Sequence, residues 1–223
     1  MARLLVIDTA TPACSVALFD NATLIADDYA DLGRGHAERL VPMIATLADK
    51  GRADSIAVNC GPGSFTGIRV GLSAAMALGI AWKIPVKGYS TLALVAHMAA
   101  RSGAHGAISI AMQAGHGELF VQNFTISHGV VQADEDSSIV SLQPGDAARL
   151  IGERNTFGSG IAMLAETIAS NEGQFILPDA RAFPADRGDF AALPPKPIYV
   201  RAPDAKPVRI NDRVSPQMEP HNG

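Results

Sequence analysis

The predicted secondary-structure elements follow the same order twice along the chain. In residues 1–100, three strand-like segments joined by turns precede a helix, a strand and a second, longer helix, and this order returns after residue 100. The period is about 105 residues, weak in residue identity and clear in the order of elements. Such a duplication predicts two similar lobes, which we place at 1–100 and 101–202. Residues 203–223 are rich in proline and poor in apolar side chains, so we expect a mobile tail there.

Apolar periodicity and turn residues give the expected bounds of these elements. Apolar runs predict strands, and apolar residues spaced by three and four predict helices. In the first half we expect strands at 4–7, 15–20, 23–30, 55–60 and 85–89, and helices at 36–49, 64–82 and 90–102. In the second half we expect strands at 107–112, 118–126, 130–133 and 156–158, and helices at 144–151 and 161–170. Ser90 should cap the helix after it, and Pro42 should kink its helix or mark a first turn.

Composition limits the classes of function open to this chain. Lys and Arg number 18 against 22 Asp and Glu, a net charge of −4, so bulk charge cannot bind nucleic acid. Cys14 and Cys60 lie in apolar contexts, which favours free buried thiols in a cytosolic protein. The N-terminal apolar run is too short for a signal peptide, and the run Ala74–Trp82 is half a membrane span. We expect a soluble, cytoplasmic protein.

A glycine-rich segment, Gly61-Pro62-Gly63-Ser64-Phe65-Thr66-Gly67, lies between a predicted strand and a predicted helix. Backbone N–H groups and a helix N-terminus at such a place can hold an anion. Alternatively, Gly61, Gly63 and Gly67 only shape a tight turn and let the helix pack closely, which is the interpretation we favour. The segment is neither a Walker loop nor the dinucleotide fingerprint, because the Gly-Lys-Ser/Thr ending and the required glycine spacing are missing.

Four segments of the chain carry a family resemblance. They are Ile7–Leu18, which opens Ile-Asp-Thr-Ala-Thr, then His36–Ile44, the run from Gly61 to Gly71, and Pro197–Pro207. Together they resemble the bacterial TsaB family, also called YeaZ. The similarity is dense over residues 4–92 and thin over 100–195, and the run Gly-Pro-Gly-Ser-Phe-Thr-Gly-Ile-Arg is its most specific part.

The resemblance implies a fold and a function. The fold would be the duplicated fold of actin, sugar kinases and heat-shock-chaperone ATPases, an α/β architecture whose two lobes are mixed sheets flanked by helices. The family is a non-catalytic subunit of the machinery that places threonylcarbamoyl on the adenosine next to the tRNA anticodon. Its implied partners are the catalytic paralogue TsaD, which uses nucleotide and metal, and the ATPase TsaE. Contact with tRNA would come only through this complex, and the chain alone would form a homodimer.

The positions that would carry chemistry in this fold argue against an active site here. Asp8 ends the first strand, but no glycine follows to let the backbone approach a phosphate, so a turn-capping role is expected. In the second lobe Gln113 is a poor Mg²⁺ ligand and replaces the family's usual Asp, while Gly115 replaces its Arg. Thr91 and Val95 fall where TsaD carries its metal-binding histidines, and neither can ligate in that way. We expect no catalytic residue, cofactor or metal.

A surface for partners is the remaining candidate site. The helices at 36–49 and 64–82 combine an apolar stripe with small side chains that allow another helix to approach closely. The resemblance implies that these helices pair with their counterparts in TsaD. The interface residues that we expect are Arg39, Leu40, Met43, Ile44, Leu47, Arg69, Leu72, Ala75 and Met76. The open alternatives are that all these apolar residues face their own sheet, or that the chain is an active enzyme. Such an enzyme would be a metal- or ATP-dependent acyltransferase, formerly called glycoprotease-like, or a small-molecule kinase.

Overall fold

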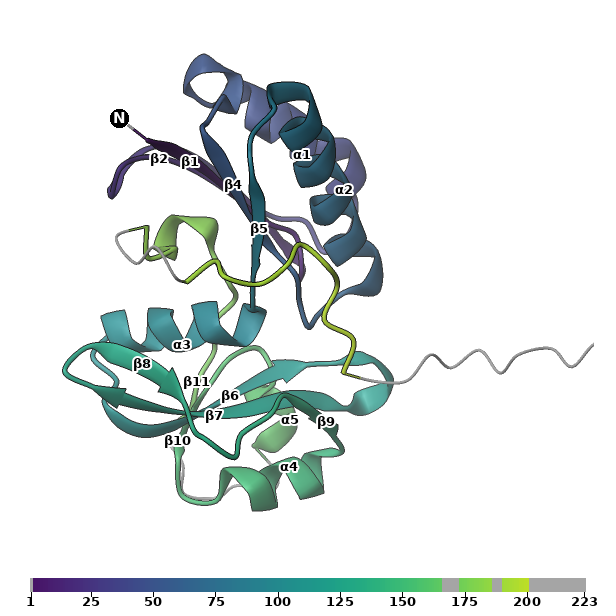
Figure 1. Cartoon of the computed structure of the whole chain (residues 1–223). Coiled ribbons are helices and arrows are strands. Elements are labelled where there is room, and N and C mark those ends of the chain that lie inside the picture. The colour runs from purple at the N-terminus through teal and green to yellow at the C-terminus, as the bar shows by residue number, and fades with distance from the viewer. Residues whose placement is uncertain (1, 166–172, 186–189, 201–223) are drawn as a thin grey trace, which may run out of the picture.

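The computed structural model describes residues 2–165, 173–185 and 190–200, which form two lobes stacked one above the other (Figure 1). The sheet of the first lobe has the order β3-β2-β1-β4-β5, and that of the second has the order β11-β10-β6-β7-β8, with β9 beside β7. In each sheet the first three strands are antiparallel and the last two run parallel to the first. Both sheets therefore share one topology, which confirms the duplicated actin-like fold.

The elements lie close to their expected positions. The first lobe contains β1 (Arg3–Asp8), β2 (Ala13–Asp20), β3 (Thr23–Asp31), α1 (His36–Thr46), β4 (Ser55–Asn59), α2 (Phe65–Trp82) and β5 (Val86–Tyr89). After α3 (Thr91–Arg101) come β6 (Gly106–Gln113), β7 (Leu119–Ser127), β8 (Val130–Ala133), β9 (Val140–Leu142), α4 (Pro144–Ile151), β10 (Asn155–Phe157), α5 (Ile161–Leu164) and β11 (Gly173–Gln174). Short 3-10 helices lie at Ala48–Gly51, Gly115–Gly117 and Ala180–Ala182.

Several local predictions need correction. The helix expected at 36–49 ends at Thr46, because Leu47 is extended and Asp49 and Lys50 have positive φ angles. Pro42 lies inside α1, so its expected place in a first turn is wrong, while the kink stays a prediction. Ser90 precedes α3, but its side chain makes no capping hydrogen bond. Of the helix expected at 161–170, α5 covers 161–164, and residues 166–170 lie outside the described residues.

The helices α1 and α2 cover one face of the first sheet (Figure 1). Between the two helices and the sheet lies the core, to which β1, β2 and β4 contribute apolar side chains that include Leu5, Ile7 and Val58. Glycines let α2 lie against the sheet: a Cβ at Gly71 would overlap the side chain of Thr9, and one at Gly79 would overlap Val86. Cys14 and Cys60 are free and buried, as expected.

The two lobes share packing elements. On α3, Leu92, Val95 and Ala99 pack against the second sheet, while Leu94 joins the core on the other face of the first sheet. The chain returns to the first lobe after β11, where residues 180–185 and 190–191 pack on its second face and the N–H of Ile198 donates to the carbonyl of Cys60 at 2.8 Å. The lobe boundaries at 100 and 202 stay predictions, and the tail at 203–223 lies outside the described residues.

Candidate functional site

The carboxyl ends of the parallel strands β1, β4 and β5 meet at one edge of the first sheet, where α/β proteins commonly bind ligands. Here they carry a hydrogen-bonded polar network. One oxygen of Asp8 accepts bonds from Asn59 Nδ2 at 2.6 Å and from the hydroxyl of Tyr89 at 3.0 Å. The Asn59 side-chain oxygen accepts from the hydroxyl of Thr91 at 2.8 Å and from the N–H of Gly61 at 2.7 Å. The network ties the strand ends to the glycine loop and to α3.

Asp8 is buried and its carboxylate is fully engaged. It is 1% exposed, and its second oxygen accepts from the N–H of Ala10 at 3.2 Å, so it caps the β1–β2 turn as expected. Burial raises the pKa of Asp8 from 3.8 to about 6, while the bonds from Asn59, Ala10 and Tyr89 oppose the rise. A carboxyl with a raised pKa is often a catalytic base. Asp8 lacks the access that such a role needs, because its partners surround it.

The glycine loop, residues 61–67, is clamped onto the β1–β2 turn by backbone contacts. The N–H of Ser64 donates to the carbonyl of Ala10 at 2.7 Å, and Ser64 Oγ caps α2 by accepting from the N–H of Gly67 at 3.2 Å. A Cβ at Gly63 would overlap the Ala10 carbonyl oxygen, and one at Gly67 would overlap that of Thr9. These contacts support the interpretation that the glycines serve close packing. Anion binding by the loop stays a prediction.

A cleft of about 590 Å³ separates the lobes next to this loop. Its walls come from residues 10–12, 31 and 62–65 of the first lobe and from 112–115, 159, 175 and 177 of the second. Of these described lining residues none is basic, and Asp31 is the charged one. A nucleotide's phosphates need cationic side chains or free N–H groups, and a carboxylate repels them. The lining therefore offers a phosphate no cationic side chain, which is a poor fit to the nucleotide that the fold family implies.

The other positions where this fold could carry chemistry offer no metal ligands or catalytic groups to the cleft. Gln113 is exposed at the cleft, and its backbone N–H donates to Ser159 Oγ at 3.0 Å. A Cβ at Gly115 would meet no neighbouring atom within 4 Å, so packing does not require glycine there. Thr91 and Val95 are both fully buried. Within the described residues no group of three His, Cys, Asp or Glu could hold a metal ion.

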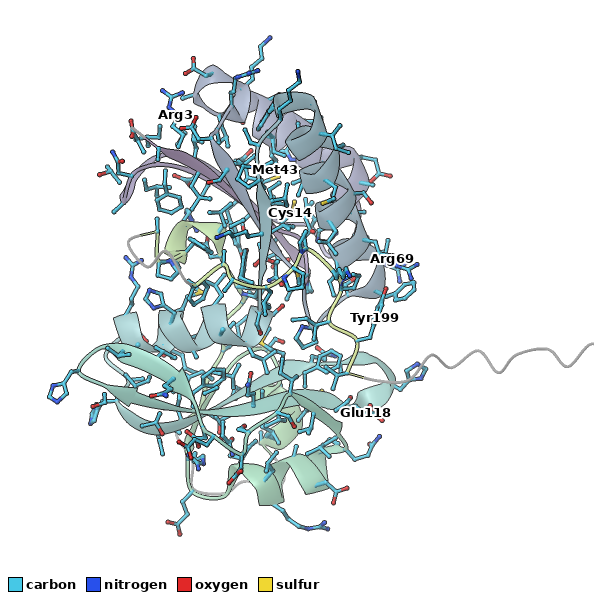
Figure 2. All side chains as sticks on the ribbon, viewed as in Figure 1. Arg3, Cys14, Met43, Arg69, Glu118 and Tyr199 are labelled. Carbon is cyan, nitrogen blue, oxygen red and sulfur yellow. The ribbon has the colours of Figure 1, made fainter. Side chains whose placement is uncertain are left out.

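The expected interface residues divide sharply by burial. Six of the nine face the sheet, so the prediction that they point outward is wrong; Figure 2 shows one of them, Met43, inside the lobe. These six are Leu40, Met43, Ile44, Leu47, Leu72 and Ala75, with exposures from 0% to 7%. Arg39, Arg69 and Met76 are exposed, as an interface requires. For Leu72 and Ala75 the error arose because α2 is apolar on two faces, so that composition alone does not say which face meets the sheet. The other four form the apolar stripe of α1 and its C-cap, and that stripe packs on the sheet.

The outward faces of α1 and α2 carry other large apolar side chains that the sequence interpretation missed. Val41 is 61% exposed, Phe65 58%, Met76 42% and Ile80 75%. We call these four residues the α1–α2 surface. Three of them lie on one stripe of α2, and the spacings from 65 to 69, 73, 76 and 80 are the helical signal that could have identified it. Among the described helices, α2 is long and apolar enough to cross a membrane, but its other face packs on the sheet.

The C-terminal segment adds an aromatic and cationic cluster to the edge of this surface. The guanidinium of Arg69 lies 3.6 Å from the ring centre of Phe65, and its Nη2 donates to the hydroxyl of Tyr199 at 3.1 Å. Figure 2 shows Arg69 and Tyr199 together at one end of α2. A groove of about 530 Å³ runs between α1 and α2 beside the cluster. The arrangement offers a partner an apolar ridge flanked by a groove.

Known proteins similar to this chain give its family. A family model described as "TsaD: tRNA N6-adenosine threonylcarbamoyltransferase" matches residues 30–149. The "tRNA threonylcarbamoyladenosine biosynthesis protein TsaB" of Escherichia coli is 34% identical over 167 residues, which are 71% of each chain. The protein of the same name from Haemophilus influenzae is 30% identical, over 89% of this chain and 93% of its own.

A solved structure agrees with these relatives. YeaZ from Pseudomonas aeruginosa superposes with a TM-score of 0.75 at 28% identity, covering 89% of this chain and all of that one. A second Pseudomonas aeruginosa structure, described as similar to "peptidase YEAZ", gives 0.74 at 26% identity. The chain therefore belongs to the TsaB (YeaZ) family.

Proposed function

We propose that this chain is a non-catalytic subunit in tRNA threonylcarbamoyladenosine biosynthesis and that it binds the catalytic paralogue TsaD through the α1–α2 surface. The observation that carries the proposal is the outer stripe of α2, where Met76 and Ile80 expose apolar side chains and Phe65, partly packed by Arg69 and Tyr199, is still 58% exposed. Contiguous exposed apolar side chains mark interaction sites in soluble proteins. The named relatives act in this biosynthesis, which supplies the pathway.

The same surface suits a second copy of the chain. Apolar, self-complementary helix pairs form twofold dimers, so we propose a homodimer when TsaD is not bound. TsaE would join the assembled complex, and tRNA would bind the complex rather than the free chain, whose net charge is −4. We propose that the protein works in the cytoplasm, where tRNA is modified.

The cleft supports a subunit without chemistry of its own. Its described walls offer no cation to a phosphate, and Asp8, the acid at the strand edge, is enclosed by its hydrogen-bond partners. We propose that TsaD supplies all of the catalytic groups.

A second candidate function is independent catalysis by this chain, as a transferase or hydrolase. The raised pKa of Asp8, about 6, and the match to a transferase family model favour it. Titration of the isolated chain with ATP, with and without Mg²⁺, separates the two candidates. The subunit proposal predicts neither binding nor turnover. Mg²⁺-dependent turnover that is lost in Asp8→Asn, with the fold retained, would establish the enzyme instead.

Calorimetric titration of purified TsaD into this chain tests the subunit proposal. Ile80→Glu places a carboxylate on a residue that is 75% exposed, so the isolated chain should stay folded. Inside an interface such a charge is desolvated, and binding should weaken by at least about thirtyfold. Val130→Glu, at 53% exposure on the second lobe, is the matched control and should bind normally. Equal binding by both variants would place the contact elsewhere.

A further inference from the structure

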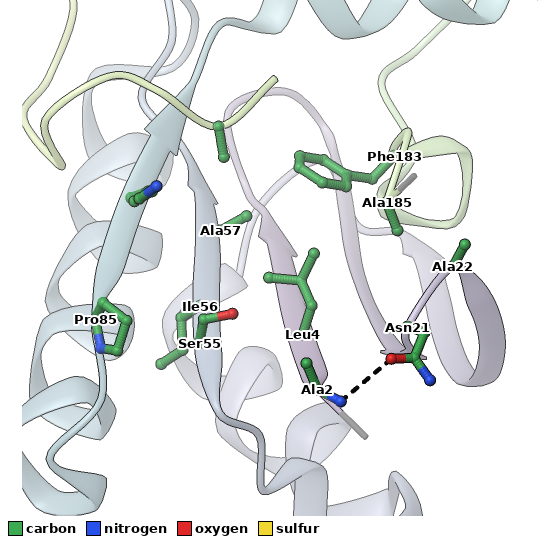
Figure 3. A pocket seen from close by; sticks show the side chains of 12 residues that line it. Ala2, Leu4, Asn21, Ala22, Ser55, Ile56, Ala57, Pro85, Phe183 and Ala185 are labelled. Atoms are coloured by element: carbon green, nitrogen blue, oxygen red, sulfur yellow. Dashed lines mark hydrogen bonds between the residues drawn. The ribbon is translucent and has the colours of Figure 1, made fainter. Parts of the chain in front are cut away.

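A second concave site lies on the face of the first sheet that α1 and α2 do not cover. The cavity measures about 500 Å³, within the range of small-molecule sites (Figure 3). Strands β1, β4 and β5 form its floor, and the ring of Phe183 forms one wall. Twelve residues line it, among them Leu4, Ser55, Ala57, Lys87 and Phe183.

The cavity exists because this face of the sheet is only half covered. At the carboxyl ends of the strands, Val6 and Tyr89 are fully buried beneath α3 and residues 180–185 and 190–191. At the amino ends, Leu4 and Ser55 remain half-buried, and no described segment covers them. The register pairs Leu4 with Ser55 and Ala57 with Lys87, so these four side chains share one face. The cavity therefore has an apolar floor and is open to solvent at the amino ends of the strands.

One cationic side chain lines this apolar cavity. Lys87, exposed on the edge strand β5, is the charged residue among the twelve. Within the described parts of the chain it forms no ion pair or side-chain hydrogen bond. The amide of Asn21 is already engaged, because its oxygen accepts from the N–H of Ala2 and its nitrogen donates to Asp20. A ligand's anionic group would therefore meet Lys87.

We propose that this cavity binds a small amphipathic carboxylate, with its hydrocarbon chain on Leu4, Ala57 and Phe183 and its carboxylate at Lys87. The apolar walls exclude a highly charged ligand, since burying a polar group without a partner is costly. A single ammonium suits a monoanion, whereas phosphate groups are usually held by several donors. The proposal is independent of the partner surface, which lies on the opposite face of the sheet.

Titration of the full chain with decanoate, below its micellar concentration, tests the proposal by calorimetry. Decanoate should bind, and decyltrimethylammonium, which has the same chain and the opposite charge, should not. Lys87→Gln should weaken decanoate about tenfold, as expected for a lost charge-assisted hydrogen bond. Lys50→Gln, an exposed lysine in the 3-10 helix at 48–51, is the matched control and should leave binding unchanged.

Cavity filling provides a second readout. Ser55→Leu should abolish decanoate binding by occupying the floor, and Ala22→Leu, at an exposed turn on the rim, should do so with little risk to folding. Thermal unfolding of each variant confirms the fold.

Three results would each overturn the proposal: no decanoate binding at millimolar concentration, equal binding of the cationic probe, or unchanged affinity in Lys87→Gln. If Arg101→Gln, and not Lys87→Gln, lost affinity for decanoate, the carboxylate would lie in the adjacent cavity and the proposal would be wrong. That cavity, which shares Phe183 and Ala185, is lined by His97, Arg101 and Arg181.

Discussion

Neighbouring residues on α2 should respond oppositely to the same substitution. Ala75 is 0% exposed and faces the sheet, whereas Met76 is 42% exposed on the α1–α2 surface. Ala75→Glu forces a longer side chain into a packed core, which costs about 1–3 kcal/mol in strain. It also buries an unpaired carboxylate, a penalty of several kcal/mol. The sum is comparable to the whole stability of a typical domain, about 5–15 kcal/mol.

Met76→Glu should leave the fold intact, because exposed substitutions usually change the free energy of unfolding by less than about 0.5 kcal/mol. Its effect should appear in assembly: losing an apolar anchor costs about 2 kcal/mol or more of binding free energy, at least a thirtyfold weaker Kd. Urea unfolding followed by circular dichroism measures the free energy of unfolding, and calorimetric titration with TsaD measures the Kd.

The pair of variants can refute the assignment of helix faces. An Ala75→Glu protein that unfolds at the wild-type urea concentration would show that Ala75 does not lie in the core. A Met76→Glu protein that unfolds readily would show that the outer stripe of α2 is packed within the chain. A stable Met76→Glu protein with normal affinity for TsaD would remove Met76 from the interface.

Two further predictions concern the polar network and the glycine loop. Because the pKa of Asp8 is raised in the folded state, its stabilising contribution is fully present below 3.8 and is lost as pH rises through about 6. The free energy of unfolding of the wild type relative to Asp8→Asn should therefore fall by about 2 kcal/mol between pH 4 and pH 7; a difference that is flat or rises with pH would contradict the burial argument. Gly63→Ala should destabilise the fold by about 1–3 kcal/mol, because its Cβ overlaps the Ala10 carbonyl oxygen, whereas Gly115→Ala, with open space around it, should be neutral. Equal thermal unfolding temperatures for the two glycine variants would show that the loop can relax away from the turn.

The sequence predicted the order of elements well because strands such as Leu4–Ile7 and helices such as α1 have clear apolar periodicity. It missed β9 and β11, which are strands of only three and two residues. The turn-capping role of Asp8 was also predictable, because a strand-end Asp commonly accepts a bond from the N–H two residues later.

The partner surface could be predicted only as a pair of helices. Small residues on α2 pack against the sheet at Gly71, Ala75 and Gly79, while the outer stripe holds Met76 and Ile80. Both faces of α2 are apolar, so periodicity does not show which face packs on the sheet and which faces a partner. The burial of the side chains in the structure is needed to decide. Tyr199 reaches Arg69 from 130 residues away, a contact that no local pattern encodes.

Threonylcarbamoyladenosine in tRNA is the most direct readout of the central claim, that the α1–α2 surface and not the cleft carries the function. It can be measured by mass spectrometry in bacteria in which this chain replaces the resident TsaB protein. Asp31→Asn combined with Gln113→Ala alters two polar residues of the cleft, and modification should stay near the wild-type level. Ile80→Glu, expressed to the same level, should lose most of it. Normal modification with Ile80→Glu, or its loss with the cleft variant, would contradict the account.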